Sequence, residues 1–261
     1  MKKRGQATLF IILGIIVVAV ILFYFVGRQT IFVPTATPES LRSEISSIDQ
    51  EILECLSDIA PGYIERIARQ GGYLATPADT YRLYNGTPVA ILCYNIENDE
   101  RCRNRMLTLK HMEEELAQHM EEDTKSCLNG VLNKRRNNKG YTILTSEDPE
   151  LIVTITKDKV FVNMEYPLSL KSKKTEFTVS SSGTHSLALD YPLGELYDVV
   201  LDIIDFETEY GYFDQLVYML SKKGRYIIDK KRPYPDIFYK LNTLDQKDFI
   251  FQLYIQGERS S

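Results

Sequence analysis

Four side chains of the kinds that bind metal ions recur at intervals of four residues near the middle of the chain. They are His111, Glu115, His119 and Asp123. In a helix, side chains four residues apart lie on one face, so each neighbouring pair could hold a shared cation. However, an amphipathic helix places charged residues beside its apolar stripe whether or not it binds a metal. We therefore interpret this face as solvated, and we expect neither a metal nor a cofactor.

A second concentration of reactive side chains is the run from Asp190 to Asp214, which contains eight carboxylates, including Asp198, Asp202 and Asp205. Paired carboxylates act as acid and base in glycoside hydrolysis, and clustered carboxylates bind Ca²⁺. Neither the loop spacing nor the flanking glycines of such sites accompany this run. We interpret it as a helix that shows its acidic side to water, and we expect the basic run 222–232 to neutralise it.

The motifs of common hydrolases and nucleotide-binding enzymes are absent from the sequence. It contains no G-x-S-x-G, no H-E-x-x-H, no P-loop and no dinucleotide fingerprint, and its only other histidine is His185. The basic runs are short and scattered and the net charge is −5, so nucleic acid is not an expected partner. We expect a non-enzymatic protein. A membrane-tethered hydrolase acting on envelope polymers, and a binding subunit of an envelope complex, stay as alternatives.

The four cysteines predict two disulfides, because an even count is read as a disulfide framework outside the cytoplasm. Cys55 lies on the apolar stripe of one expected helix, and Cys127 extends the stripe of a second helix by seven residues. Packing of these stripes favours the pair Cys55–Cys127, and Cys93 and Cys102 would then close a short loop. Four free buried thiols are the alternative if the domain faces the cytoplasm.

Asn85-Gly86-Thr87 combines two signals. Asn-Gly between apolar runs is typical of a tight β-hairpin turn, and Asn-x-Thr is an N-glycosylation sequon. Both need an exposed turn, so Asn85 is a candidate glycosylation site in an exported protein.

The amino-terminal segment predicts a membrane anchor. From Thr8 to Val26 there is no charged residue, and a helix of that length would span about 28 Å, close to the hydrocarbon core of a bilayer. Lys2, Lys3 and Arg4 precede this run, and a lone Arg28 follows it. By the positive-inside rule we expect a single-pass protein in the cell membrane with a cytoplasmic N-terminus and an extracytoplasmic C-terminal domain. The opposite orientation is the alternative.

The same residues resemble the class III, type IV pilin-like signal sequence of archaeal surface proteins. The resemblance lies in Lys2-Lys3-Arg4-Gly5, then Gln6-Ala7-Thr8 and the apolar helix. It implies that a prepilin-type peptidase cuts between Gly5 and Gln6 and that the helix stays on the mature protein. The expected partners are this peptidase, the lipid bilayer, and other pilin-like or envelope subunits.

The resemblance is incomplete. The family pattern Gln-x-Ser-x-Glu is met by Gln6 and by Thr8 in place of serine, but Phe10 stands where the glutamate should be. This departure puts filament assembly in doubt and leaves membrane insertion untouched. The head also resembles uncharacterised archaeal membrane proteins around Gln70-Gly-Gly-Tyr-Leu, a likeness that implies no known activity. An ordinary uncleaved anchor is the alternative.

The remaining pattern predicts an α+β fold in which amphipathic helices are mixed with mostly antiparallel strands. The expected domains are a basic leader over 1–5, a transmembrane helix over 6–26, a linker over 27–36 and an extracytoplasmic domain over 37–261, with a sub-boundary near 133–140. Helices are expected over 37–70, with a kink or restart at Pro61, and over 107–128, 193–209 and 213–220. Strands are expected over 81–84, 88–94, 151–156, 159–166, 168–170, 175–180, 226–228, 237–241 and 249–255.

Overall fold

The computed structural model describes residues 14–22, 37–95, 102–138, 140–145 and 148–257. Residues 14–22 are helical and exposed. Within the described part of the chain, no helix has the length and apolarity needed to cross a bilayer. Most of the predicted transmembrane segment 6–26, together with the leader and the linker, lies outside the described residues.

Residues 37–257, called the head below, are built around one long helix, α2 (Pro38–Arg69). Thr37 caps its start by accepting a hydrogen bond from the backbone N–H of Ser40, and Pro38 occupies the first helical position, as the sequence predicted. The helix continues through Pro61, where a kink or restart was expected. Ala60 and Ile64 on either side of this proline are fully buried, so tertiary packing maintains the helix there.

The end of α2 is joined closely to a β-sheet. The chain turns at Gly71, whose φ of +76° is a conformation that favours glycine, and a Cβ atom there would lie 3.2 Å from both Ala90 Cβ and the Gln252 carbonyl oxygen. The backbone N–H of Ala90 also donates to the Gln70 carbonyl at 3.1 Å. The predicted helix end at the two glycines is therefore correct, and it docks the helix onto the sheet.

The largest sheet has the order β1-β2-β12-β11-β10, and β3 pairs with β2 beside this path. All its pairings are antiparallel except β12 with β2, which are parallel and come from distant parts of the chain. Its strands are β1 (Tyr81–Tyr84), β2 (Thr87–Tyr94), β3 (Arg103–Asn104), β10 (Tyr226–Lys231), β11 (Ile237–Thr243) and β12 (Phe251–Ile255).

Two antiparallel three-stranded sheets complete the β-structure, with the orders β4-β7-β8 and β5-β6-β9. Their strands are β4 (Tyr141–Thr145), β5 (Glu150–Ile155), β6 (Val160–Glu165), β7 (Leu168–Ser172), β8 (Thr178–Ser180) and β9 (Thr184–Leu189). The described head is thus α+β with mostly antiparallel strands, as predicted.

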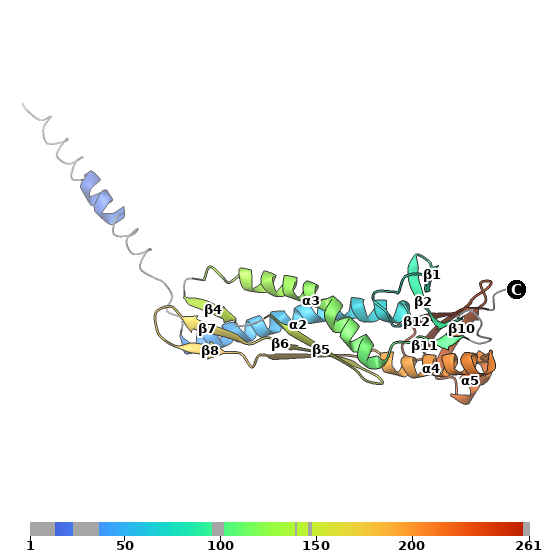
Figure 1. The fold of residues 1–261 in the computed structure, drawn as a ribbon. Helices are drawn as coiled ribbons and strands as arrows, with labels where there is room; N and C mark the ends of the chain where they lie inside the picture. The colour runs from blue at the N-terminus through green and yellow to red at the C-terminus, as the bar shows by residue number, and fades with distance from the viewer. Residues whose placement is uncertain (1–13, 23–36, 96–101, 139, 146–147, 258–261) are drawn as a thin grey trace, which may run out of the picture.

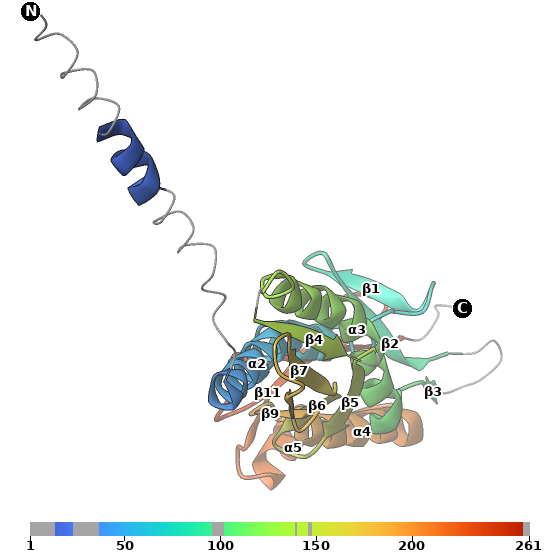
Figure 2. The same cartoon turned by 90° about the vertical axis from the view of Figure 1, so that its left-hand side faces the viewer.

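Three further helices pack on this framework: α3 (Leu109–Asn133), α4 (Leu193–Tyr210) and α5 (Gln215–Ser221). Helix α2 packs against α3 along the head, while α4 packs against the largest sheet (Figure 2). Figure 1 shows α2 running from the end that carries β4, β7 and β8, called the base below, to the end that carries the largest sheet, called the tip.

One hydrophobic core runs through the head and contains residues of α2, α3, α4 and all three sheets. Helix α2 contacts elements on both sides of residues 133–140, namely α3 before them and β7, β9 and β12 after them. At this connector Arg135 donates hydrogen bonds to Glu44 at 2.7 Å and to Glu51, both on α2. At the expected sub-boundary, Arg135 therefore joins the chain to the central helix.

Candidate functional site

Both predicted cysteine pairings are present in the structure. Cys55 on α2 is bonded to Cys127 on α3, with the two Cα atoms 6.0 Å apart. Cys93 on β2 is bonded to Cys102 just before β3, with a Cα separation of 5.2 Å. All four cysteines lie in the described part of the chain, and none is free. Each bond links elements that also pack or pair with each other.

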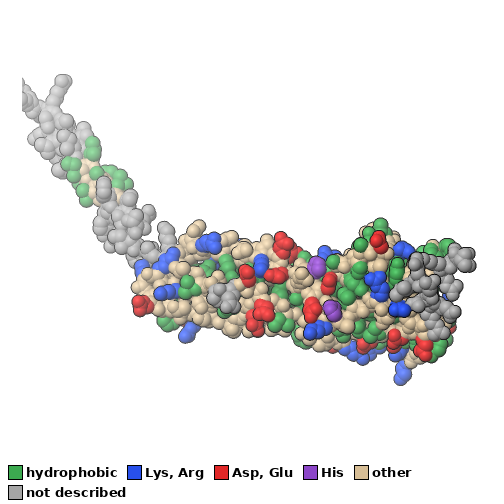
Figure 3. Space-filling model, in the orientation of Figure 1, with side chains coloured by type: hydrophobic (Ala, Val, Ile, Leu, Met, Phe, Trp, Pro, Cys, Tyr) green, Lys and Arg blue, Asp and Glu red, His purple; other side chains and the backbone are tan. Residues whose placement is uncertain are grey.

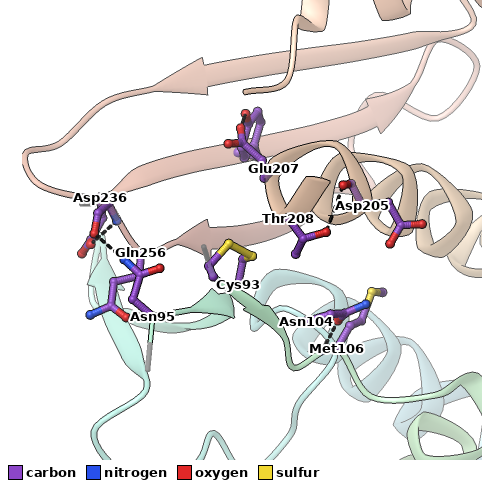
Figure 4. Close-up of a disulfide and its surroundings, with 12 residues drawn as sticks. Cys93, Asn95, Asn104, Met106, Asp205, Glu207, Thr208, Asp236 and Gln256 are labelled. Atoms are coloured by element: carbon purple, nitrogen blue, oxygen red, sulfur yellow. Dashed lines mark hydrogen bonds between the residues drawn. A yellow bond between two sulfur atoms is a disulfide. The ribbon is translucent and has the colours of Figure 1, made fainter. Parts of the chain in front are cut away.

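The second disulfide lies beside a polar network at the end of the largest sheet (Figure 4). Asn95 donates its backbone N–H to Gln256 Oε1 at 2.8 Å and its side-chain amide to the Gly257 carbonyl at 2.9 Å. The buried carboxylate of Asp236 accepts from the Gly257 N–H and, at 2.7 Å, from Arg82. These contacts hold the final strand of the head in place, so we assign this network a structural role.

The face of α3 that could bind a metal instead forms contacts within the head. Glu115 accepts hydrogen bonds from the backbone N–H groups of Leu74 and Ala75, and Asp123 accepts from the Tyr63 hydroxyl at 2.8 Å. His111 Nδ1 lies 2.8 Å from the Thr108 hydroxyl at the helix start, and His119 Nδ1 lies 2.8 Å from the Glu115 carbonyl oxygen. The described residues contain no group of three metal-ligating side chains. His111 and Asp123 are exposed and Glu115 and His119 are half-buried, so the face is largely solvated as expected, while two of its carboxylates also contact neighbouring segments.

The acidic run on α4 divides into exposed and buried members. Asp198 and Asp205 are exposed, as predicted, but Glu195 and Glu207 are buried. The predicted neutralisation by the basic run is confirmed by three ion pairs: Arg225–Glu195, Lys222–Asp202 at 3.6 Å and Lys230–Glu207 at 3.4 Å. The run therefore attaches α4 to the residues around α5 and β10.

The Lys230–Glu207 pair is the most deeply buried charged cluster among these contacts. Lys230 Nζ also donates to the Phe213 carbonyl at 2.8 Å and lies 4.6 Å from the centre of the Tyr212 ring. The Tyr239 hydroxyl donates to the same Glu207 oxygen. Burial lowers the pKa of Lys230 and raises that of Tyr239, while Glu207 favours the charged lysine. Lys230, Glu207 and Tyr239 each have a polar partner in this cluster, which fixes α4 to the sheet.

The arrangement best suited to binding lies on the outer face of the largest sheet, at the tip. A hollow of about 310 Å³ opens there, and we call it the tip hollow. Its lining consists of Tyr84, Lys231, Arg232, Pro233, Phe238 and Tyr254. Pockets that bind small ligands typically start near this volume.

An aromatic cluster forms one wall of the tip hollow. The Tyr84 and Phe238 rings are stacked with their centres 4.2 Å apart, and the Tyr254 ring lies 5.0 Å from that of Phe238. Val89 and Ile91 support these rings in a small core that is separate from the main one. The wall is therefore rigid and does not depend on flexible side chains for its shape.

The rim of the tip hollow is basic. Lys231 Nζ donates to the Tyr84 hydroxyl at 3.2 Å and lies 3.6 Å from Asp229. Arg232 has no ion-pair partner among the described residues, and its charge also acts on Lys230 and Tyr239 of the buried cluster. In the view of Figure 3, hydrophobic and basic side chains lie side by side at this end of the head. The hollow thus offers an apolar surface with cationic donors at its edge.

The predicted glycosylation site lies at the same end of the head. Asn85 and Gly86 have φ of +50° and +83° in the exposed turn between β1 and β2, as expected for a tight hairpin. Asn85 directly follows Tyr84 of the tip hollow. Its glycosylation stays a prediction, and the processing residues Gly5 and Gln6 lie outside the described residues.

The tip hollow has no clear signature in the sequence. Tyr84, Phe238 and Tyr254 each lie in a correctly predicted strand, but they are brought together by the parallel pairing of β12 with β2. The one available signal was the basic run at Lys230-Lys-Arg232 next to a strand. Compared with known proteins, the chain matches no protein-family model, no curated protein and no solved structure.

Proposed function

We propose that the chain is a non-enzymatic, single-pass surface protein that is anchored by residues 6–26 and has a structural, adhesive or assembly role. In this proposal the leader is pilin-like and is cut between Gly5 and Gln6, and the head lies outside the membrane. The observation that carries the binding role is the tip hollow, where a rigid aromatic wall is combined with a basic rim.

The disulfides support the extracytoplasmic location. Disulfides persist in oxidising compartments and are rare in the cytosol, and all four cysteines of this chain are paired. The orientation expected from Lys2, Lys3 and Arg4 would place the head in such a compartment.

The length of α2 supports a role for the tip in contacting a partner. Its 32 residues correspond to about 48 Å of helix, and they separate Pro38 at the base from the sheet that carries the tip hollow. An anchored head of this kind would present the hollow away from the chain segment that enters the membrane.

The chemistry of the hollow indicates the kind of partner. Arg232 and Lys231 would attract carboxylates, while Tyr84, Phe238 and Pro233 would contact an apolar group or the face of a ring. We therefore propose a partner that carries acidic groups on an apolar or ring-shaped framework.

The anchoring proposal is tested on the native protein. Mass spectrometry of the full chain isolated from its own membrane should find a mature terminus at Gln6 and no free thiol. A chain that retains Met1 and has four free thiols would contradict both processing and export.

The binding proposal is tested with defined polymers. Full chain in detergent micelles should bind a polyuronate or poly-glutamate more tightly than a neutral glucan, and Arg232→Ala should weaken that binding. Arg136→Ala removes an exposed arginine at the base and serves as the matched control. Equal binding of acidic and neutral polymers, or equal losses in both variants, would argue against the tip hollow as the site.

A further inference from the structure

A second surface of the head consists of residues that belong neither to the tip hollow nor to the expected anchor. Helix α5 and the end of α4 expose large apolar side chains, including Leu220, which is 80% exposed, and Tyr210, Leu216 and Val217, each of which is more than 60% exposed. We call the set Phe206, Tyr210, Tyr212, Leu216, Val217 and Leu220 the α5 patch. Soluble proteins rarely leave such groups together in water unless the surface has a partner.

The contacts of α5 show how the patch is displayed. Phe213 is buried and packs edge-on against Phe206 of α4 with the ring centres 5.9 Å apart. Tyr218, on the inner face of α5, donates its hydroxyl to Asp202 of α4 at 2.6 Å. Helix α5 therefore runs back along α4 after the turn at Gly211, and its opposite face, with Leu216 and Leu220, points to solvent.

Charged side chains of opposite sign lie at the two ends of the α5 patch. Near the turn, α4 exposes Asp205 and Glu209. At the far end, α5 is followed by the exposed Lys223 and by Lys222, whose Nζ lies 3.6 Å from Asp202 of α4. The patch is thus acidic at one end and apolar in the middle, and Lys223 supplies a positive charge at the other end.

We propose that the α5 patch binds the same patch on a second copy of this chain, related by a two-fold axis, with the two α5 helices antiparallel. A two-fold interface brings one surface against itself, so it must be self-complementary. The antiparallel arrangement brings the basic end of each patch to the acidic end of the other and covers both apolar centres. A lipid surface is a poorer occupant, because Asp205 and Glu209 would face its anionic headgroups.

The test measures association of the full chain in detergent micelles by light scattering over a range of concentrations. Leu220→Glu should weaken dimerisation about tenfold or more, because it places a charge on the most exposed apolar side chain of the patch. The matched control is Leu83→Glu, which changes a leucine that is 67% exposed on β1, outside the patch. The control should dimerise like the natural chain. Equal effects of the two substitutions, or a natural chain that stays monomeric throughout, would overturn the proposal.

A charge exchange tests the antiparallel arrangement. Lys223→Glu and Asp205→Lys should each weaken the dimer, whereas the double variant should recover most of the lost association because the opposite charges meet again. Losses that simply add in the double variant would refute the antiparallel pairing. The patch would instead be assigned to the membrane if the natural chain forms no dimer at any concentration but binds anionic vesicles, and if Leu220→Glu abolishes that binding.

A photo-reactive phenylalanine separates this interface from association through the anchors. Placed at position 220, it should cross-link two full chains in the native membrane, and placed at position 83 it should not. Dimers that form through the anchor alone would persist in Leu220→Glu and would give no cross-link at position 220. That result would also overturn the proposal. This test is independent of ligand binding at the tip hollow.

Discussion

Replacing Lys230 by methionine is expected to leave a charge without its partner inside the head. The Lys230 side chain is 4% exposed and that of Glu207 is 3% exposed, and Nζ lies 3.4 Å from Glu207 Oε1. Methionine fills much of the same volume but supplies no positive charge and no donor. Glu207 would then keep only the hydrogen bond from Tyr239.

The expected cost follows from these contacts. Removing one partner of a buried ion pair typically destabilises a protein by about 3–5 kcal/mol. The double variant Glu207→Gln with Lys230→Met removes both charges and keeps an acceptor for the Tyr239 hydroxyl. It should lose only about 1 kcal/mol, because the Phe213 carbonyl still loses the donor that lies 2.8 Å away. The coupling energy between the two positions should therefore exceed about 2 kcal/mol.

The assay is urea unfolding of the full chain in detergent micelles with the disulfides intact, followed by near-ultraviolet circular dichroism. The neighbouring substitution Lys231→Met changes a half-exposed lysine and should alter stability by less than about 0.5 kcal/mol. A loss below about 1 kcal/mol in Lys230→Met would refute the reasoning.

Three further predictions concern the same head. Removing the disulfide with Cys55→Ala and Cys127→Ala should cost about 4 kcal/mol of unfolding free energy, since the bond closes a separation of 72 residues, and urea unfolding measures this. Burial lowers the pKa of His185, against the opposing effects of Asp49 and a backbone hydrogen bond to Tyr166. The unfolded chain therefore binds the proton of His185 more readily than the folded head does. The contribution of His185 to the free energy of unfolding is complete above about pH 6.5 and is lost as the pH falls below that value. In the variant His185→Gln, the melting temperature should depend less on pH between pH 8 and pH 5. Glu115→Ala should cost about 1–3 kcal/mol through the lost backbone acceptor, equally with and without added Zn²⁺, whereas a deficit seen only with Zn²⁺ would indicate a metal role.

Much of the local structure could be predicted because the relevant signals are close together in the sequence. The apolar stripe that begins at Leu41 and passes through Cys55 predicted both the central helix and one cysteine pair. Asn85-Gly86 predicted a hairpin, and its two positive φ angles explain why those residues stand there. In each case one short segment determines the conformation.

The missed elements depend on distant partners. Strand β9 carries Thr184, His185 and Ser186, which give little strand signal, and it forms by pairing with β6. The buried state of Glu195 and Glu207 was missed for a related reason, since their partners Arg225 and Lys230 follow 30 and 23 residues later. Prediction of the tip hollow and of these ion pairs requires knowledge of which strands and helices pack together.

The bond between Cys55 and Cys127 also determines how the head would respond to a pulling force. A load applied between Pro38 and the strands after α3 passes through α2 to Cys55, crosses the covalent bond and continues from Cys127. The intervening chain, which contains β1, β2 and Tyr84 of the aromatic wall, lies outside that load path. About 250 Å of contour length therefore stays locked even when the surrounding elements are stretched apart. A head loaded in this way can bear tension while β1, β2 and the Tyr84 side of the tip hollow keep their shape.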